Sequence, residues 1–371
     1  MLPGPNDKKN AGESFPVNEF TYLGTAARVI FGAGSLRHLE REIELLGASR
    51  ALVLCTPGQV GMAQDVAQRL GARTAGLFTQ AAMHVPIETA RAARAQAREL
   101  GADCVVAIGG GSTIGLGKAI ALEAPAGSLP VLAIPTTYSG SEMTSIYGIT
   151  EAGVKKTGKD PRVLPRTVIY DAELTLSLPV GLSMTSGLNA MAHSAEGLYA
   201  QDGNPIMALL AEEGIRALAA ALPRVALHPQ DIDARSSAQY GAWLCGIVLG
   251  NVGMALHHKL CHTLGGSFNL PHAETHAVVL PHAIAYNAPA IPAALAVLRR
   301  ALGRDDPARA LFDLAAQLGA PTSLAALGMP AEGIERAADL ATQNPYWNPR
   351  PIERAAITEL LQHAYNGQAP A

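Results

Sequence analysis

The first half of the chain alternates short apolar runs with segments of helical periodicity. Several of the runs are rich in β-branched residues, and they lie at residues 50–57, 74–79, 103–112, 130–138 and 166–171. Between them, stretches such as residues 85–100 repeat apolar side chains every three or four positions. This alternation predicts an α/β region in which helices cover a mostly parallel sheet.

From about Leu178 onward the strand-like runs disappear, and long segments rich in Ala and Leu take over. We therefore expect a flexible arm over residues 1–17, an α/β dinucleotide-binding domain over residues 18–177 and an α-helical domain over residues 178–371. Residues 236–256 carry no charge and are long enough to span a membrane. Because this stretch stands alone and runs into histidines and a lysine, we expect a buried helix instead.

Charge and cysteine content exclude several classes of protein. The chain has 28 Lys and Arg residues against 31 Asp and Glu residues, whereas a nucleic-acid-binding protein normally shows a strong basic surplus. The four cysteines form no CxxC pair, which favours a reducing compartment. The polar N-terminus lacks the apolar core of a signal peptide. The sequence thus predicts a cytoplasmic protein with neither a nucleic-acid nor a membrane partner.

Two polar clusters follow apolar runs of the predicted sheet. The first is a glycine-rich turn before a helical pattern, formed by Gly109, Gly110, Gly111 and Ser112. The second spans residues 135–142 and includes Thr136, Thr137 and Ser141. Backbone N–H groups at a strand-to-helix turn can approach a pyrophosphate, and the helix N-terminus favours its negative charge. We expect both clusters to bind a nucleotide at the carboxyl edge of the sheet; a tight turn and a hydroxyl-rich loop are the alternatives.

Histidines concentrate in the second half, where seven of the 11 lie between residues 193 and 282. Three helical segments each carry a pair of polar residues four positions apart, and the pairs are Asn189 and His193, His258 and His262, and His272 and His276. Residues at this spacing face the same side of a helix. A single histidine on an apolar helix is usually a core residue, but three such faces predict a shared metal or catalytic site.

Taken together, these motifs resemble the iron-containing (group III) alcohol dehydrogenase family, and within it the maleylacetate reductase branch. The resemblance rests on the GGGS turn, the PTTYSGSE segment, NAMAH and the histidine block over residues 257–282, and it extends over nearly the whole chain. It implies an N-terminal nucleotide domain, a C-terminal helical domain and an active site in the cleft between them, in a homodimer.

The resemblance also implies residue roles. The two polar clusters match the family's cofactor segments, and His262 matches a histidine at the nicotinamide end that takes part in proton transfer. The positions that match the family's metal ligands are Asn189, His193, His258 and His272. The family's Asp is Asn189 here, and an amide carries no charge to offset a divalent ion. We therefore expect no tightly bound metal.

The resemblance implies that NADH or NADPH reduces maleylacetate to 3-oxoadipate in the degradation of aromatic compounds. Hydrogen-bond donors can stabilise the enolate oxygen without a Lewis acid. His193, His258 and His272 are then candidates for catalysis and for binding the substrate's two carboxylates, with Tyr147 as a further lining candidate. The alternatives are a metal-dependent (iron or zinc) alcohol or polyol dehydrogenase of the same family, and a non-catalytic nucleotide-binding protein.

Two departures from the family pattern concern the cofactor. Glycine stands at position 115 where the family's GGGS motif continues to an Asp. After the apolar run that ends at Leu54, the residues Cys55, Thr56 and Pro57 offer no carboxylate to the adenosine ribose. Because such a carboxylate discriminates against a 2′-phosphate, we expect both NADH and NADPH to serve.

Overall fold

The computed structural model describes residues 27–124 and 129–370, so the arm predicted over residues 1–17 lies outside the described residues. A six-stranded sheet has the order β1-β8-β5-β4-β2-β3, and every neighbouring pair is parallel. Its strands are β1 (Arg28–Phe31), β2 (Ala51–Leu54), β3 (Thr74–Phe78), β4 (Cys104–Gly109), β5 (Val131–Pro135) and β8 (Thr167–Tyr170). The predicted parallel sheet is confirmed, and each of the five apolar runs contains one strand.

Two layers of helices cover the sheet. They are α1 (Leu39–Leu45), α2 (Val60–Leu70), α3 (Ile87–Glu99) and α4 (Gly111–Glu123). Alternate residues of a strand point to opposite faces: Leu52 and Leu54 pack with α3 and α4, whereas Val53 packs with α1 and α2. All four residues of β2 are buried, as expected for a strand covered on both faces.

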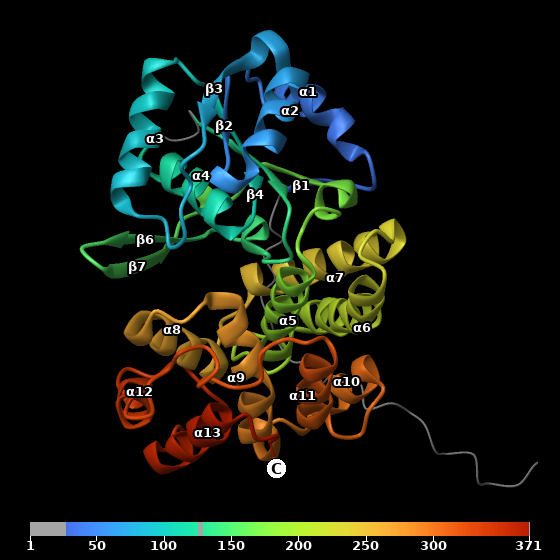
Figure 1. Ribbon diagram of the computed structural model, residues 1–371, viewed down its shortest axis with the longest axis vertical. Helices are drawn as coiled ribbons and strands as arrows, with labels where there is room; N and C mark the ends of the chain where they lie inside the picture. The colour runs from blue at the N-terminus through green and yellow to red at the C-terminus, as the bar shows by residue number, and fades with distance from the viewer. Residues whose placement is uncertain (1–26, 125–128, 371) are drawn as a thin grey trace, which may run out of the picture.

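A small antiparallel hairpin, which the sequence analysis did not predict, projects from the sheet half. It pairs β6 (Ile146–Glu151) with β7 (Val154–Lys159). The two linking residues, Ala152 and Gly153, have φ values of 50° and 75°, as the tightest hairpin turns require. In Figure 1 the hairpin extends over the region above α8.

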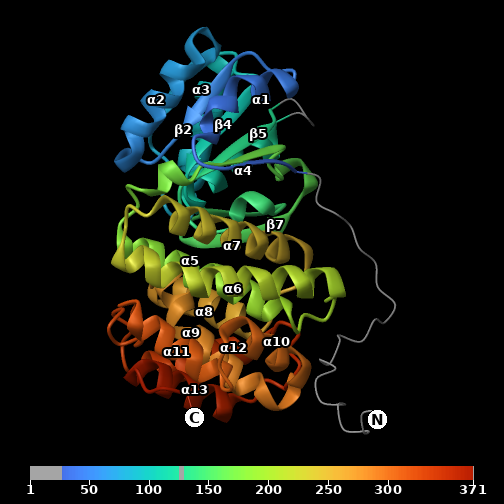
Figure 2. The same cartoon turned by 90° about the vertical axis from the view of Figure 1, so that its right-hand side faces the viewer.

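The second half of the described chain is helical, which confirms the predicted fold class. Its helices are α5 (Val180–Gly197), α6 (Pro205–Leu227), α7 (Ile232–Asn251), α8 (Leu256–Phe268), α9 (His272–Asn287), α10 (Pro292–Leu302), α11 (Pro307–Gln317), α12 (Gly333–Thr342) and α13 (Arg354–Asn366). Helix α5 is almost entirely buried. Figure 2 shows α5, α6 and α7 as a layer directly beneath the sheet half.

The uncharged stretch over residues 236–256 is not the single buried helix that we expected. It contains most of α7 and a break, and α8 then begins at Leu256 at an angle of 94° to α7. No single helix within the described residues is long and apolar enough to cross a membrane, although α7 and α8 together pass by length and composition. The break matters for the site because it redirects the chain just before His257 and His258.

Candidate active site

The glycine turn and the second polar cluster lie against each other. Gly109 ends β4 with a φ of 152°, and a Cβ there would lie 2.5 Å from Thr113 Oγ1. A Cβ at Gly110 would lie 2.9 Å from the Thr137 methyl group. Only glycine therefore allows the turn to approach Thr113 and Thr137 this closely. The two predicted cofactor segments thus lie side by side, as we expected from the parallel sheet.

Polar atoms around this turn lack partners. The hydroxyls of Thr113, Thr137 and Ser139 are buried and have no hydrogen-bond partner among the described residues. Ser112 lies in the first turn of α4, where backbone N–H groups have no acceptor inside the helix. Unpartnered donors at a helix N-terminus fit the phosphates of a nucleotide cofactor.

Sequence reasoning missed Gln59 at the same edge of the sheet. Its amide nitrogen donates to Thr136 Oγ1 at 2.8 Å, and its carbonyl oxygen accepts from Thr56 Oγ1 at 3.1 Å. Gln59 thereby ties the end of β2 to the end of β5. No pattern in the sequence marked it, because the contact spans 77 residues.

A second residue that sequence reasoning missed, Lys118, is fully buried on α4 and holds the second predicted cofactor segment. Its ammonium donates to the carbonyls of Ser141 and Ile146 at 2.6 and 2.8 Å and to the Thr144 hydroxyl at 2.9 Å. Burial lowers the pKa of Lys118 to about 7, and the nearby carboxyl of Glu142 opposes that shift. The lysine fixes the backbone that follows Ser141, so Ser141 is held by its carbonyl.

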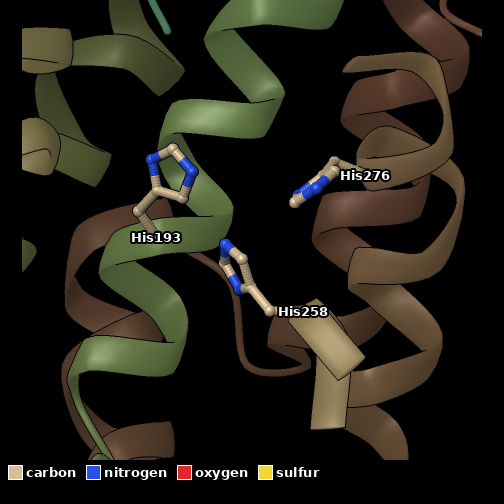
Figure 3. A group of neighbouring side chains, drawn as sticks. All are labelled: His193, His258 and His276. Atoms are coloured by element: carbon tan, nitrogen blue, oxygen red, sulfur yellow. The ribbon is translucent and has the colours of Figure 1, made fainter. Parts of the chain in front are cut away.

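Three histidines from three helices meet in the helical half. His193 on α5, His258 on α8 and His276 on α9 can bring one ring nitrogen each to within 4.8 Å of one another. Figure 3 shows the three rings converging from their helices. All three are buried, with exposed fractions of 3%, 4% and 0%. One buried ring nitrogen on each has no hydrogen-bond partner in the described part of the chain, namely Nδ1 of His193 and Nε2 of His258 and His276.

The close group holds His276 where the resemblance implied His272, whose role at the site stays a prediction. His276 completes the group, whereas His272, the first residue of α9, is exposed, with its ring centroid 4.3 Å from that of His276. Pro271 precedes α9 as its N-cap, as expected. Asn189 lies one turn before His193 on α5, and its buried amide oxygen has no partner among residues 27–124 and 129–370. Spacing along α9 puts His272 and His276 on one face, but helix packing decides which one meets His193.

A buried carboxylate, Glu196, positions this group. Its oxygens accept from the backbone N–H groups of Ala255 and His257 at 3.0 and 2.7 Å, and Nδ1 of His258 lies 2.6 Å away. Such a contact orients the imidazole so that its other nitrogen faces the site. A signal existed in the sequence, since Glu196 is the only charged residue in α5 and stands three positions after His193.

Burial and mutual repulsion keep most of these imidazoles neutral. Burial, followed by the charges of neighbouring histidines, lowers the pKa of His193 and of His276 well below 6.5. His257 Nε2 lies 3.0 Å from His276 Nδ1, and burial likewise lowers the pKa of His257. Neutral rings can each donate one hydrogen bond and accept another.

His262 lies one turn beyond His258 on α8 and is exposed as a residue. Its Nδ1 lies 3.0 Å from the hydroxyl of Tyr346, which fixes the ring's orientation and which sequence reasoning missed. Surrounding protein atoms lower the pKa of His262 to about 3. Tyr147 lies over Gly158, where a Cβ would approach its hydroxyl to 2.4 Å. Its role as a lining residue stays a prediction.

The cofactor segment and the histidines meet at Gly140, the residue before Ser141. Its φ is 79°, and a Cβ there would lie 3.7 Å from His193 Nδ1 and 3.0 Å from the Cα of Gly246 on α7. The two predicted clusters, from opposite halves of the chain, therefore form one continuous site.

The donor set decides which groups fit this site. Three imidazole nitrogens at this spacing can hold a zinc or iron ion. Asn189 adds only a neutral amide oxygen, and Glu196 is already committed to His258. The site therefore has enough donor atoms to bind a divalent ion, but no carboxylate oxygen of the described residues is available to contact that ion directly.

Comparisons with known proteins agree with the resemblance. The family model for iron-containing alcohol dehydrogenases matches residues 26–172. The model for the C-terminal region of the same family matches residues 183–365. The chain therefore belongs to the iron-containing alcohol dehydrogenase family.

Within that family, the chain is similar to proteins named maleylacetate reductase. The one from Burkholderia cepacia is 63% identical, over 96% of this chain and 100% of the relative. Crystal structures of maleylacetate reductases from Agrobacterium tumefaciens and from Rhizobium sp. strain MTP-10005 have TM-scores of 0.92 and 0.91. Each is 58% identical and covers 95% of this chain and 100% of its own.

Proposed function

We propose that this protein reduces maleylacetate to 3-oxoadipate, with NADH or NADPH as the hydride donor, in the degradation of aromatic compounds. The observation that carries the proposal is the junction at Gly140, where a nucleotide-binding turn adjoins buried imidazoles with unpartnered nitrogens. Identity of 63% to a maleylacetate reductase supports the choice of substrate.

The chemistry asks for hydrogen-bond donors and a proton. The bound nicotinamide would supply a hydride to the alkene carbon in the β position relative to the ketone. Negative charge then develops on the ketone oxygen, and imidazole N–H groups of His193, His258 or His276 stabilise it as a preorganised donor set. His262 is exposed and held by Tyr346. Its lowered pKa keeps the ring neutral, so it relays a proton from water to the adjacent carbon. One hydride and one proton complete the reduction.

We propose that this reaction proceeds without a tightly bound metal. If an ion binds, His193, His258 and His276 would hold it, and it would act as a Lewis acid toward the ketone oxygen. Imidazole nitrogens and the Asn189 amide provide no negative charge in direct contact with a divalent ion, so we infer weak binding. The imidazoles then remain free to donate to the substrate.

The metal-dependent alcohol or polyol dehydrogenase remains the second candidate, because the three-histidine group could accommodate an ion. Steady-state oxidation of NADH and NADPH with maleylacetate, beside oxidation of simple alcohols with NAD⁺, tests the two. We expect rapid maleylacetate reduction that survives chelator treatment. Turnover of alcohols alone, abolished by chelator, would favour the second candidate and reject the first.

A further inference from the structure

A fully buried histidine outside the three-histidine group, His257, contacts one member of that group. Its Nε2 lies 3.0 Å from Nδ1 of His276, and the two rings meet edge to face with their centroids 4.8 Å apart. Both residues have an exposed fraction of 0%. The backbone N–H of His257 donates to Glu196 at 2.7 Å, which fixes the first turn of α8. His257 therefore occupies one ring nitrogen of His276, and the other, Nε2, has no partner within the described residues.

The contact between the two rings holds one proton, and either ring can carry it. If His257 carries it on Nε2, then Nδ1 of His276 accepts, and His276 has its own proton on Nε2. If His276 carries it on Nδ1, then His257 has its own proton on Nδ1, and Nε2 of His276 is a lone pair. Each arrangement leaves one buried N–H without an acceptor, but on a different ring and in a different place.

The two faces of α8 decide between these arrangements. His258 and His262, four positions apart, lie on the face that carries the site. His257 and Cys261, also four positions apart, share another face, and Cys261 belongs to an apolar cluster formed by α8, α9, α12 and α13. Nδ1 of His257 is buried and has no partner among residues 27–124 and 129–370.

A buried N–H without an acceptor is rare in proteins. On Nε2 of His276 the N–H lies beside the converging histidines, where an oxygen atom of a ligand can accept it. On Nδ1 of His257 it would stay unpaired whether or not the site is occupied. Cys261 Sγ lies 3.7 Å from Nε2 of His257, but a thiol is a weak donor and leaves Nδ1 unpaired. The proton of the contact therefore belongs to His257.

The partner of His258 has the opposite effect. Nδ1 of His258 lies 2.6 Å from a carboxylate oxygen of Glu196, and an ionised carboxylate only accepts hydrogen bonds. His258 therefore keeps its proton on Nδ1 and offers a lone pair at Nε2. A metal ion needs such a lone pair from every histidine that binds it, whereas a ketone or enolate oxygen needs an N–H donor. The first condition holds at His258, and the second holds at His276.

We propose that His257 is a positioning residue that holds His276 as an N–H donor, so that the three-histidine group binds a substrate oxygen in preference to a metal ion. This inference rests on the proposed function and deepens it by assigning the donor to the ketone oxygen. The hydrogen bond between the rings must reverse before His276 can offer a lone pair to an ion. Reversal moves the unpaired N–H to the face of α8 that packs in the apolar cluster.

Nitrogen NMR of the imidazole rings in wild-type protein measures the proton positions directly, because a ring nitrogen with a proton resonates far from one without. The signals of His276 are assigned by their absence in His276→Gln. In protein free of metal and substrate we expect a proton on Nε2 of His276 and none on Nδ1. A proton on Nδ1 of His276 would overturn the inference, whatever the enzyme's activity toward maleylacetate.

Zinc binding to His257→Gln is a second test, which has an unusual direction. The glutamine amide can donate or accept, so it allows His276 to turn a lone pair toward an ion. Zinc affinity, measured by competition with a coloured chelator, should rise roughly 10–100-fold, the scale of changes around a metal ligand. An unchanged or lower affinity is the result for a residue that only packs, and it would overturn the inference. Cys261→Ala, on the same face of α8, is the matched control and should bind zinc as the wild type does.

Steady-state kinetics connect the donor to the reaction. His257→Leu, which removes the hydrogen bond, should lower kcat for maleylacetate roughly 10–100-fold with KM for NADH nearly unchanged, and His257→Gln should recover part of that loss. A wild-type kcat in His257→Leu would overturn the inference and leave the proposed function standing. Wild-type protein that carries the proton on Nε2 of His276 but does not turn over maleylacetate would reject the proposed function itself.

Discussion

The two sides of the site bury polar side chains in opposite ways. On the sheet side, the Lys118 ammonium gives hydrogen bonds to three acceptors of the chain, so nothing remains for a ligand. On the helical side, His193, His258 and His276 each keep one buried nitrogen without a partner. Buried polar atoms without partners cost free energy. Lys118 therefore holds backbone in place, whereas the three histidines, like the unpartnered hydroxyls of the glycine turn, are prepared for a ligand.

The largest expected effect tests the helical side. His262→Ala should lower kcat by roughly 10²–10⁴-fold, the range for removing a general acid or base, while KM for NADH stays nearly unchanged. Steady-state rates with maleylacetate measure this. His228→Ala, at an exposed histidine after α6, is the control. Near-normal turnover in His262→Ala would leave His262 as a packing residue and remove it from the proton path.

The next prediction tests the sheet side. Lys118→Met should reduce the free energy of unfolding by about 3–5 kcal/mol, because three buried acceptors and the Glu142 carboxyl lose their donor and their counter-charge. Denaturant unfolding measures this against Lys156→Met, whose exposed site should change stability by less than about 0.5 kcal/mol. A Lys118→Met protein with wild-type stability but weakened NADH binding would contradict the structural role of Lys118, because the lysine would then bind a ligand.

A third prediction concerns the lack of a directly bound carboxylate beside the histidine group. Purified wild-type protein should contain far less than one zinc or iron per chain, and chelator should leave its activity intact. Asn189→Asp adds a charged oxygen donor beside three imidazoles, so metal affinity should rise, roughly 10–100-fold on the scale of changes around a metal site. Maleylacetate reduction should then fall as the rings become committed to the ion.

Metal analysis and activity after chelation decide this third prediction, with Asn189→Ala as the control that adds no carboxylate. Stoichiometric metal in the wild type, with loss of activity on chelation, would contradict it. The Asn189 amide would then be an adequate ligand, and the enolate would need a Lewis acid.

How far the sequence predicts this molecule depends on how local each signal is. The strands β2, β3, β4, β5 and β8 follow from buried apolar runs, which a parallel sheet covered on both faces requires. The β6–β7 hairpin lacks such a run because β7 is almost entirely exposed. Helical spacing predicted that His272 and His276 share a face, but only the packing of α5 against α9 selects His276.

Two buried charges could have been found from the sequence. Glu196 is the only charged residue of α5, and Lys118 is the only cation of α4. A charged residue alone in an apolar helix is rarely buried unless it is paired, so each marks a specific polar contact. Gln59 carried no comparable signal, because its placement depends on a contact between the ends of distant strands.

The smallest expected effect concerns the far end of the cofactor. NADH and NADPH should both support turnover, with a preference below roughly a hundredfold, about 2.7 kcal/mol. The end of β2 explains this, since Thr56 and Gln59 present neutral groups that bond to each other, and neither repels a 2′-phosphate. Steady-state kinetics with each cofactor measure the ratio, and a preference of several thousandfold would show that another residue discriminates. Thr56→Asp sharpens the test, because a carboxylate there should favour NADH over NADPH while leaving KM for maleylacetate, set by the helical side, unchanged.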